Sequence, residues 1–129
     1  MYRIGLSTCG RKPVDAVSLR AMKRAGIDVI EICMEADRSV DFRRIRADAD
    51  AVGIGLWSVH SHMRADFDIS SLDRESNRRA LRELGWLTDT VSEVGIDKLV
   101  IHPTHTPEPF DQTERREKLY HGSPSAKAE

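Results

Sequence analysis

Short apolar runs alternate with amphipathic segments along most of the chain. Apolar residues recur at the spacing of an α-helix in three segments, which cover residues 13–25, 40–52 and 74–94. Four shorter apolar runs flank these segments and predict β-strands, which cover residues 2–7, 28–34, 56–62 and 98–102. The chain is therefore expected to alternate between strand and helix, and to begin with a strand.

Residues that favour helix ends support these boundaries. Glycine is favoured just after the last residue of a helix, because it adopts a positive φ without strain. Ser39 and Asp73 are suitable N-caps for the second and third helices. Asp111, with a glutamate three residues later, forms a capping-box pattern, so a fourth helix is expected to begin near Gln112. The glycines that follow the three predicted helices are Gly26, Gly53 and Gly95.

The alternation of elements predicts an α/β fold. Strands that are separated by helices run parallel, because each helix returns the chain to the same end of the sheet. A complete (β/α)₈ barrel takes roughly 250 residues, so a chain of 129 residues provides about half of one. We expect residues 1–120 to form this half barrel of about four parallel strands, and residues 121–129 to be a disordered polar tail.

Side chains alternate across a strand, which divides each predicted strand into two faces. The large apolar residues suit packing under the helices; they are Ile4, Leu6, Ile30, Ile32, Trp57, Val59, Leu99 and Ile101. Leu56 falls on the opposite face, where polar side chains gather near the ends of the strands. A barrel interior accommodates polar groups only when they pair or serve a site. These polar residues are Ser7, Glu31, Ser58, His60, His62 and His102.

Two histidines stand at the ends of consecutive predicted strands. Neighbouring strands lie about 4.8 Å apart, so His60 and His102 can reach one divalent metal ion at roughly 2.0–2.1 Å per Zn–N contact. His62 and His105 are close enough in sequence to join or support them. In the alternative interpretation, these histidines only form hydrogen bonds with loops.

Glu31 fits several interpretations at the end of the second predicted strand. Its carboxylate could be a third metal ligand, an acid/base group, or an acceptor for a substrate hydroxyl. It could equally be a salt-bridged carboxylate in the polar layer of a barrel. The pattern of residues leaves these roles open.

Composition narrows the classes of partner. The chain has 20 basic and 21 acidic residues, which gives no general attraction to nucleic acid or to an anionic membrane. The N-terminal residues lack the apolar region of a signal peptide, and no apolar run approaches the roughly 20 residues that cross a bilayer. Two cysteines are too few for a disulfide scaffold. We therefore expect a cytoplasmic protein without membrane or nucleic-acid partners.

Four motifs in order along residues 1–119 resemble the xylose isomerase-like superfamily of TIM barrels. The motifs are Ile4-Gly5-Leu6-Ser7, Ala25-Gly26-Ile27-Asp28-Val29-Ile30-Glu31-Ile32, Ser58-Val59-His60 and Leu99-Val100-Ile101-His102-Pro103. The family includes sugar and sugar-phosphate isomerases and epimerases, inosose dehydratases, and endonuclease IV-type nucleases. The resemblance implies that the chain is the N-terminal half of such a barrel.

The resemblance also implies roles for particular residues. Many members bind a divalent metal ion in the barrel mouth, which here would be Mn, Zn, Co or Mg. Histidines that match His60 and His102 are metal ligands in the nuclease-like members, and a glutamate that matches Glu31 lies near the substrate pocket in sugar-converting members. We assign a catalytic role to Glu31. We assign substrate binding to Ser7, His62 and His105.

The family's later strands have no counterpart in this sequence. In the sugar isomerases and epimerases those strands carry most of the metal-binding carboxylates and the acid/base pair. The leading expectation is therefore a truncated or split sugar isomerase or epimerase with little activity alone, whose partner is a missing C-terminal half or a second copy. The alternatives are an endonuclease IV-like phosphodiesterase, whose basic groove the net charge of −1 does not support, and a non-catalytic half barrel that self-associates.

Overall fold

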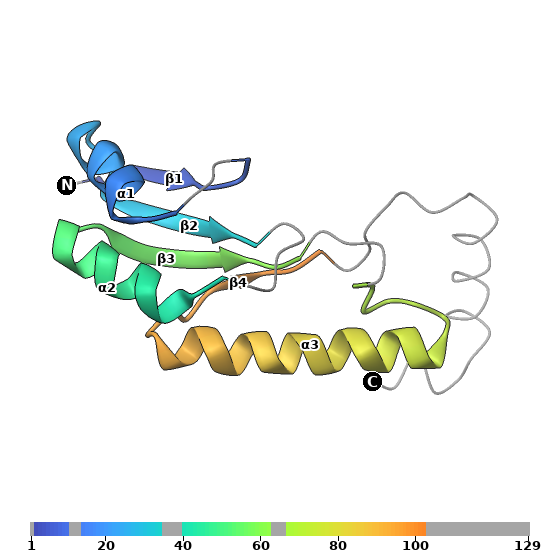
Figure 1. Ribbon diagram of the computed structural model, residues 1–129. Coiled ribbons are helices and arrows are strands. Elements are labelled where there is room, and N and C mark those ends of the chain that lie inside the picture. The colour runs from blue at the N-terminus through green and yellow to red at the C-terminus, as the bar shows by residue number, and fades with distance from the viewer. Residues whose placement is uncertain (1, 11–13, 35–39, 63–66, 103–129) are drawn as a thin grey trace.

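A computed structural model describes residues 2–10, 14–34, 40–62 and 67–102 (Figure 1). The four strands are β1 (Gly5–Ser7), β2 (Val29–Cys33), β3 (Gly55–His60) and β4 (Leu99–Val100). The three helices between them are α1 (Ala16–Arg24), α2 (Phe42–Val52) and α3 (Arg74–Glu93). All strand pairs are parallel, in the order β1-β2-β3-β4. The predicted α/β class, with the arrangement of half a TIM barrel, is confirmed, whereas the predicted fourth helix and the tail 121–129 lie outside the described residues.

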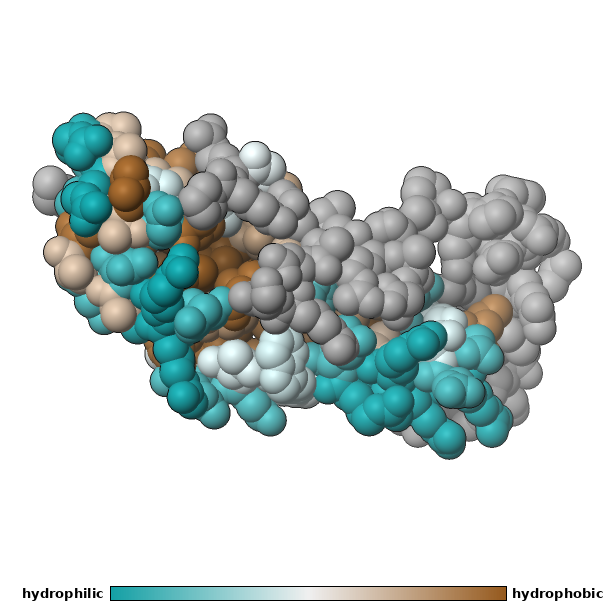
Figure 2. All heavy atoms as spheres, in the orientation of Figure 1, coloured by the Kyte–Doolittle hydropathy of each residue, from teal (hydrophilic) through white to brown (hydrophobic). Residues whose placement is uncertain are grey.

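The hydrophobic core lies between the sheet and the helices. Ile30 and Ile32 of β2 and Val59 of β3 point into it and are almost fully buried. Figure 2 shows hydrophobic residues behind the polar side chains of the helices, while the part formed by α3 is largely hydrophilic. The helices contribute Leu19, Phe42, Ile45, Ala49, Leu87 and Val91 to this core.

Aspartate side chains fix the beginnings of the helices. Asp15 accepts hydrogen bonds from the backbone N–H groups of Val17 and Ser18, so α1 begins three residues later than its predicted start. The cap of α2 is Asp41 and not Ser39, because the Oδ1 atom of Asp41 accepts from the N–H of Arg44 at 2.9 Å. The predicted cap of α3 is confirmed: Asp73 accepts from the N–H of Ser76 at 2.8 Å.

The predicted ends of the helices are also confirmed. Gly26, Gly53 and Gly95 have positive φ angles of 86°, 75° and 71°, as expected for the residue at which a helix ends. After α1, the N–H of Ile27 donates to the carbonyl oxygen of Met22 at 3.1 Å. These turns lead directly into the following strands.

A β-bulge in β3 reverses part of the predicted alternation. Ile30 lies opposite Leu56, whereas the next residue of β2, Glu31, lies opposite Ser58. Trp57 is thus an extra residue without a partner on β2. A bulge of this kind interrupts the alternation, so the side chains before it face the opposite side from the one that strict alternation predicts. The predicted faces of Leu56 and Trp57 are therefore wrong. Leu56 packs against the core, and Trp57 is 49% exposed on the other side of the sheet.

The predicted faces are wrong in part for β1 and correct for β4. Ile4 precedes β1, which begins at Gly5, and it is 57% exposed instead of packed under a helix. Leu99 packs against the core as predicted, and Val100 is exposed. Within the described part of the chain, no helix combines the length and the apolar character that crossing a bilayer requires.

Candidate functional site

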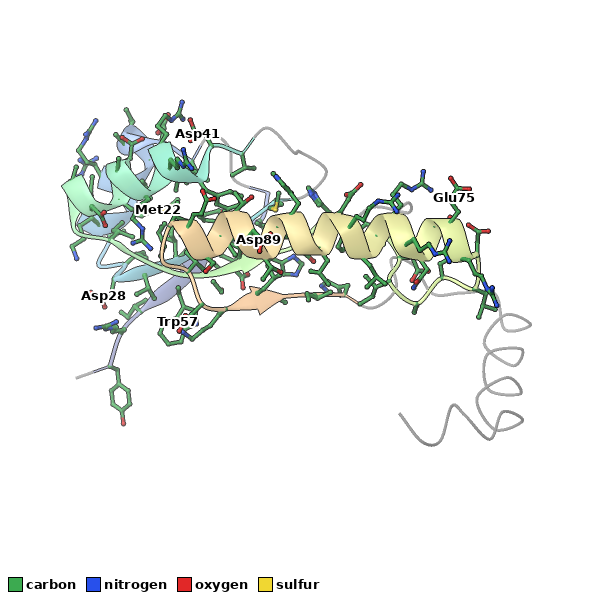
Figure 3. The ribbon with its side chains drawn as sticks, turned by 90° about the horizontal axis from the view of Figure 1, so that it is seen from below. Met22, Asp28, Asp41, Trp57, Glu75 and Asp89 are labelled. Carbon is green, nitrogen blue, oxygen red and sulfur yellow. The ribbon has the colours of Figure 1, made fainter. Side chains whose placement is uncertain are left out.

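The candidate site lies on the face of the sheet that α1, α2 and α3 leave uncovered, which we call the open face. In Figure 3, Trp57 lies on this side of the sheet, away from Met22 of α1 and Asp41 of α2. Because all strands are parallel, their C-terminal ends meet at one edge of the sheet. The pairing sets Ser7 beside Glu31, and Glu31 beside Ser58.

A hydrogen bond joins two of these polar side chains across neighbouring strands. The hydroxyl of Ser58 donates to Oε2 of Glu31 at 3.0 Å. Ser58 is buried and Glu31 is half-buried. Among the described residues, Glu31 has no ion-pair partner, so the structure does not support the salt-bridged interpretation of this carboxylate within that part of the chain.

His60 and His102 are brought together as predicted. Their Nε2 atoms lie 2.9 Å apart, and their ring centroids lie 4.8 Å apart. The Nδ1 atom of His60 lies 3.1 Å from the backbone carbonyl oxygen of Ser61. A carbonyl oxygen only accepts, so this contact puts the proton of a neutral His60 on Nδ1 and leaves a lone pair on Nε2.

This histidine pair fits part of a metal site. A tetrahedral metal ion bound by both Nε2 atoms at about 2.0–2.1 Å would hold those atoms roughly 3.3 Å apart, so the two rings would need to separate by only a few tenths of an ångström. The contact of His60 Nδ1 with a backbone carbonyl is the usual orienting bond of a metal-binding histidine. The described residues contain no group of three histidine, cysteine or acidic side chains able to hold a metal ion. A metal ion held by this pair would therefore need further ligands from outside the described residues.

The predicted substrate-binding residues Ser7 and His62 make other contacts. Ser7 is exposed at the end of β1, where its Oγ accepts from the N–H of Cys9 at 3.4 Å. His62 is only 2% exposed and its ring packs edge-on against Phe67, with centroids 5.8 Å apart. His105 lies outside the described residues. The structure thus groups Glu31 with Ser58, and His60 with His102, but it buries His62 away from solvent.

A hollow of about 340 Å³ on the open face adds two residues that the sequence pattern did not single out. The Nζ atom of Lys98 lies 4.3 Å from the ring centroid of Trp57, within the range of a cation–π interaction. Lys98 also pairs with Asp97 at 2.6 Å. Trp57 could not have been placed here by alternation, because the bulge is invisible in the apolar pattern. The hollow is lined by Gly5, Leu6, Ser7, Val29, Ile30, Glu31, Trp57, Ser58, Lys98 and Val100.

Comparison with known proteins shows similarity to a solved structure but to no family model. No family model matches the sequence, and no curated protein matches it. The chain is similar to the structure of an L-ribulose 3-epimerase, with a TM-score of 0.62 and 25% sequence identity. The match covers 99% of this chain and 47% of that one, so the chain spans about half the length of the epimerase.

Proposed function

We propose that this chain forms part of the active site of a sugar or sugar-phosphate isomerase or epimerase of the xylose isomerase-like superfamily. One observation carries the proposal: the Glu31–Ser58 pair and the His60–His102 pair stand on adjacent parallel strands at the edge where such barrels bind ligands. The similarity to an L-ribulose 3-epimerase supports a sugar as substrate. The proposal includes the cytoplasmic location expected from the sequence.

In this proposal, His60 and His102 hold a divalent ion through their Nε2 atoms. Mixed nitrogen and carboxylate ligation suits Mn, Zn or Co. Mg is the alternative that depends more on oxygen ligands, because it is a harder cation. When bound, such an ion polarises a carbonyl or hydroxyl group of the sugar. The contact between His60 and the Ser61 carbonyl fixes the imidazole that would face the ion.

Glu31 is proposed to act on the sugar directly. The hydroxyl of Ser58 donates to Oε2 and holds the carboxylate at the open face. A carboxylate held in this way accepts a hydrogen bond from a sugar hydroxyl, or takes a proton from the carbon beside a carbonyl group. Ser7 is exposed beside it and can donate to the same ligand. Substrate binding by His62 and His105 stays a prediction, and the burial of His62 suits a supporting role.

Epimerisation requires groups on both sides of the substrate. The configuration of a carbon inverts when a proton leaves one face of the sugar and another arrives at the opposite face. The sheet offers the groups of one side, with Glu31 among them. The opposite groups, together with further metal ligands, must come from outside the described residues. For this reason we expect little activity from the 129-residue chain on its own.

Calorimetric titration of Mn²⁺ and Zn²⁺ into the metal-free chain tests the metal part of the proposal. We expect binding in the micromolar range or tighter, and its loss in the His60→Ala/His102→Ala double variant. The His121→Ala variant is the control, because none of the interpretations assigns that histidine to the site. Unchanged affinity in a folded double variant would overturn the assignment of these ligands.

A metal-dependent phosphodiesterase is the second candidate. The pairing of His60 with His102 is its support, because a metal ion bound there could coordinate a phosphate oxygen as well as a sugar oxygen. The residues that line the hollow count against this candidate. The acidic side chain of Glu31 offsets the basic side chain of Lys98 there, so the hollow is not the basic surface that binds a phosphate backbone. Binding of duplex DNA that weakens steeply as salt rises would favour this candidate over a sugar-converting enzyme.

A further inference from the structure

We propose that a second copy of this chain covers the open face, so that two half barrels close into one eight-stranded barrel around a twofold axis. The pairing of two copies is inferred from the fold alone. Its catalytic consequence rests on the proposed function: the second copy would supply the opposite side of the substrate site. The evidence comes from the exposed apolar face, from the two edge strands, from the chain lengths and from the position of Trp57.

The open face exposes apolar side chains that a protein interior normally covers. Trp57 is 49% exposed and Val100 is 39% exposed, both on the side of the sheet away from the described helices. Gly5 and Leu6 line the same hollow. An apolar hollow bordered by polar groups such as Glu31 is typical of a surface that binds another protein or a ligand.

The edges of the sheet specify which kind of partner fits. β1 and β4 are the two edge strands, and both run in the same direction. A twofold axis along the barrel would place β4 of each copy beside β1 of the other, with all eight strands parallel. An eight-stranded parallel arrangement is the closed form of this architecture, and closure removes the exposed edges. A second copy therefore matches in the number, order and direction of its strands.

The lengths of the chains agree with this partner. A closed barrel of this architecture needs four further parallel strands, each with its own crossover of a dozen or more residues. This chain matches 47% of the L-ribulose 3-epimerase chain, so two copies together come close to the length of that protein. The cover of the open face is thus expected from a partner of the same size.

Trp57 is the expected anchor of the interface. The bulge in β3 turns its ring onto the open face, and the Lys98 ammonium lies over that ring at 4.3 Å. Tryptophan is enriched among the residues that dominate binding energy at protein interfaces. Closure would bury this ring inside the barrel, below the edge that carries His60.

Sedimentation equilibrium of the purified chain tests the inference without sugar or metal. We expect twice the chain mass of 14.6 kDa. Trp57→Glu should raise the dissociation constant at least about 30-fold, the effect of substituting an interface hot spot. Trp86→Glu is the matched control, because Trp86 is 44% exposed on α3 and should tolerate the charge without dissociation.

Fluorescence shows whether the correct face is covered, even if Trp57→Glu fails to fold. The chain has two tryptophans, so Trp86→Phe leaves Trp57 as the single emitter. Its emission should move to shorter wavelength as protein concentration rises, whereas Trp86 in the Trp57→Phe variant should not shift. A monomer at all concentrations, or a dimer without the Trp57 shift, would overturn the inference. Either result leaves the proposed metal site untouched, because that site is tested by calorimetry on its own histidines.

Discussion

The Nε2 atoms of His60 and His102 lie 2.9 Å apart, although 42 positions separate the two residues in the sequence. Two neutral imidazoles at this distance need one donor and one acceptor. His60 is the acceptor at Nε2, because its proton is on Nδ1, which donates a hydrogen bond to the carbonyl oxygen of Ser61. The pair is therefore asymmetric before any ligand arrives.

This asymmetry predicts different tautomers for the two rings. In metal-free protein at alkaline pH, nitrogen-15 NMR should show His60 protonated on Nδ1 and His102 protonated on Nε2. Addition of Zn²⁺ should change the Nε2 signals of both rings while His60 keeps its proton on Nδ1. Finding His60 protonated on Nε2 in the metal-free state would contradict the observed contact with Ser61.

The hydrogen bond between Ser58 and Glu31 should contribute measurably to stability. Ser58→Ala removes the donor at a buried position, and we expect the free energy of unfolding to fall by about 0.5–1.5 kcal/mol. Glu31→Gln should cost less, because its amide oxygen still accepts from Ser58. Urea unfolding of both variants measures the difference. Unchanged stability in Ser58→Ala, together with a loss in Glu31→Gln, would show that the charge of Glu31, and not the hydrogen bond, is what matters.

Two glycines of similar surroundings should respond to alanine in opposite ways. Gly85 lies inside α3, and an added Cβ would meet no atom within 4 Å. Gly85→Ala should therefore stabilise the protein by about 1 kcal/mol. Gly53 is equally open but has a φ of 75°, so Gly53→Ala should destabilise by about 1–2 kcal/mol. Thermal unfolding distinguishes these signs, and stabilisation by Gly53→Ala would show that α2 can end without a left-handed residue.

Acid should weaken the starts of α1 and α3. The N–H of Ser18 holds the pKa of Asp15 below its ordinary 3.8, and the N–H of Ser76 does the same to the pKa of Asp73. A lowered pKa means that each carboxylate stabilises the folded state above pH 3.8, and that this contribution is lost as pH falls through the lower folded value. Unfolding midpoints measured between pH 5 and pH 2 should show this loss.

Asparagine at these two positions is the control for the acid effect. Asp15→Asn and Asp73→Asn keep a capping oxygen, since asparagine caps helices about as well as aspartate. The double variant should therefore keep its stability near pH 5 and should lose part of the steep decline at lower pH. An unchanged pH profile would mean that other carboxylates cause the decline.

Apolar periodicity was sufficient to predict the order of the elements, because each helix has one side packed on the sheet and each strand is short. It also predicted that His60 and His102 meet, since parallel strands bring their C-terminal ends together. The glycines also predicted the helix ends, because this signal is local. Gly26, Gly53 and Gly95 adopt positive φ angles that would strain most other residues.

Features that depend on contacts between elements escaped prediction. Strict alternation placed Trp57 under the helices, but the shift of register between β2 and β3 is decided by how Leu56 and Val59 both reach the core. No pattern in the sequence indicated that His62 is buried. Its burial against Phe67 depends on a loop that carries no periodic pattern.

The bulge in β3 makes Trp57 a residue that the strand could lose without changing its pairing. Leu56 and Val59 both face the core, although three positions separate them where regular alternation allows two or four. Without Trp57, Leu56 would still face Ile30 and Ser58 would still face Glu31, now in an uninterrupted ladder. The strand that ends in His60 can therefore change in length by one residue while the histidine keeps its partner. In evolutionary terms, deletion of the single codon for Trp57 would remove the aromatic ring from the open face and leave the polar site at its edge in place.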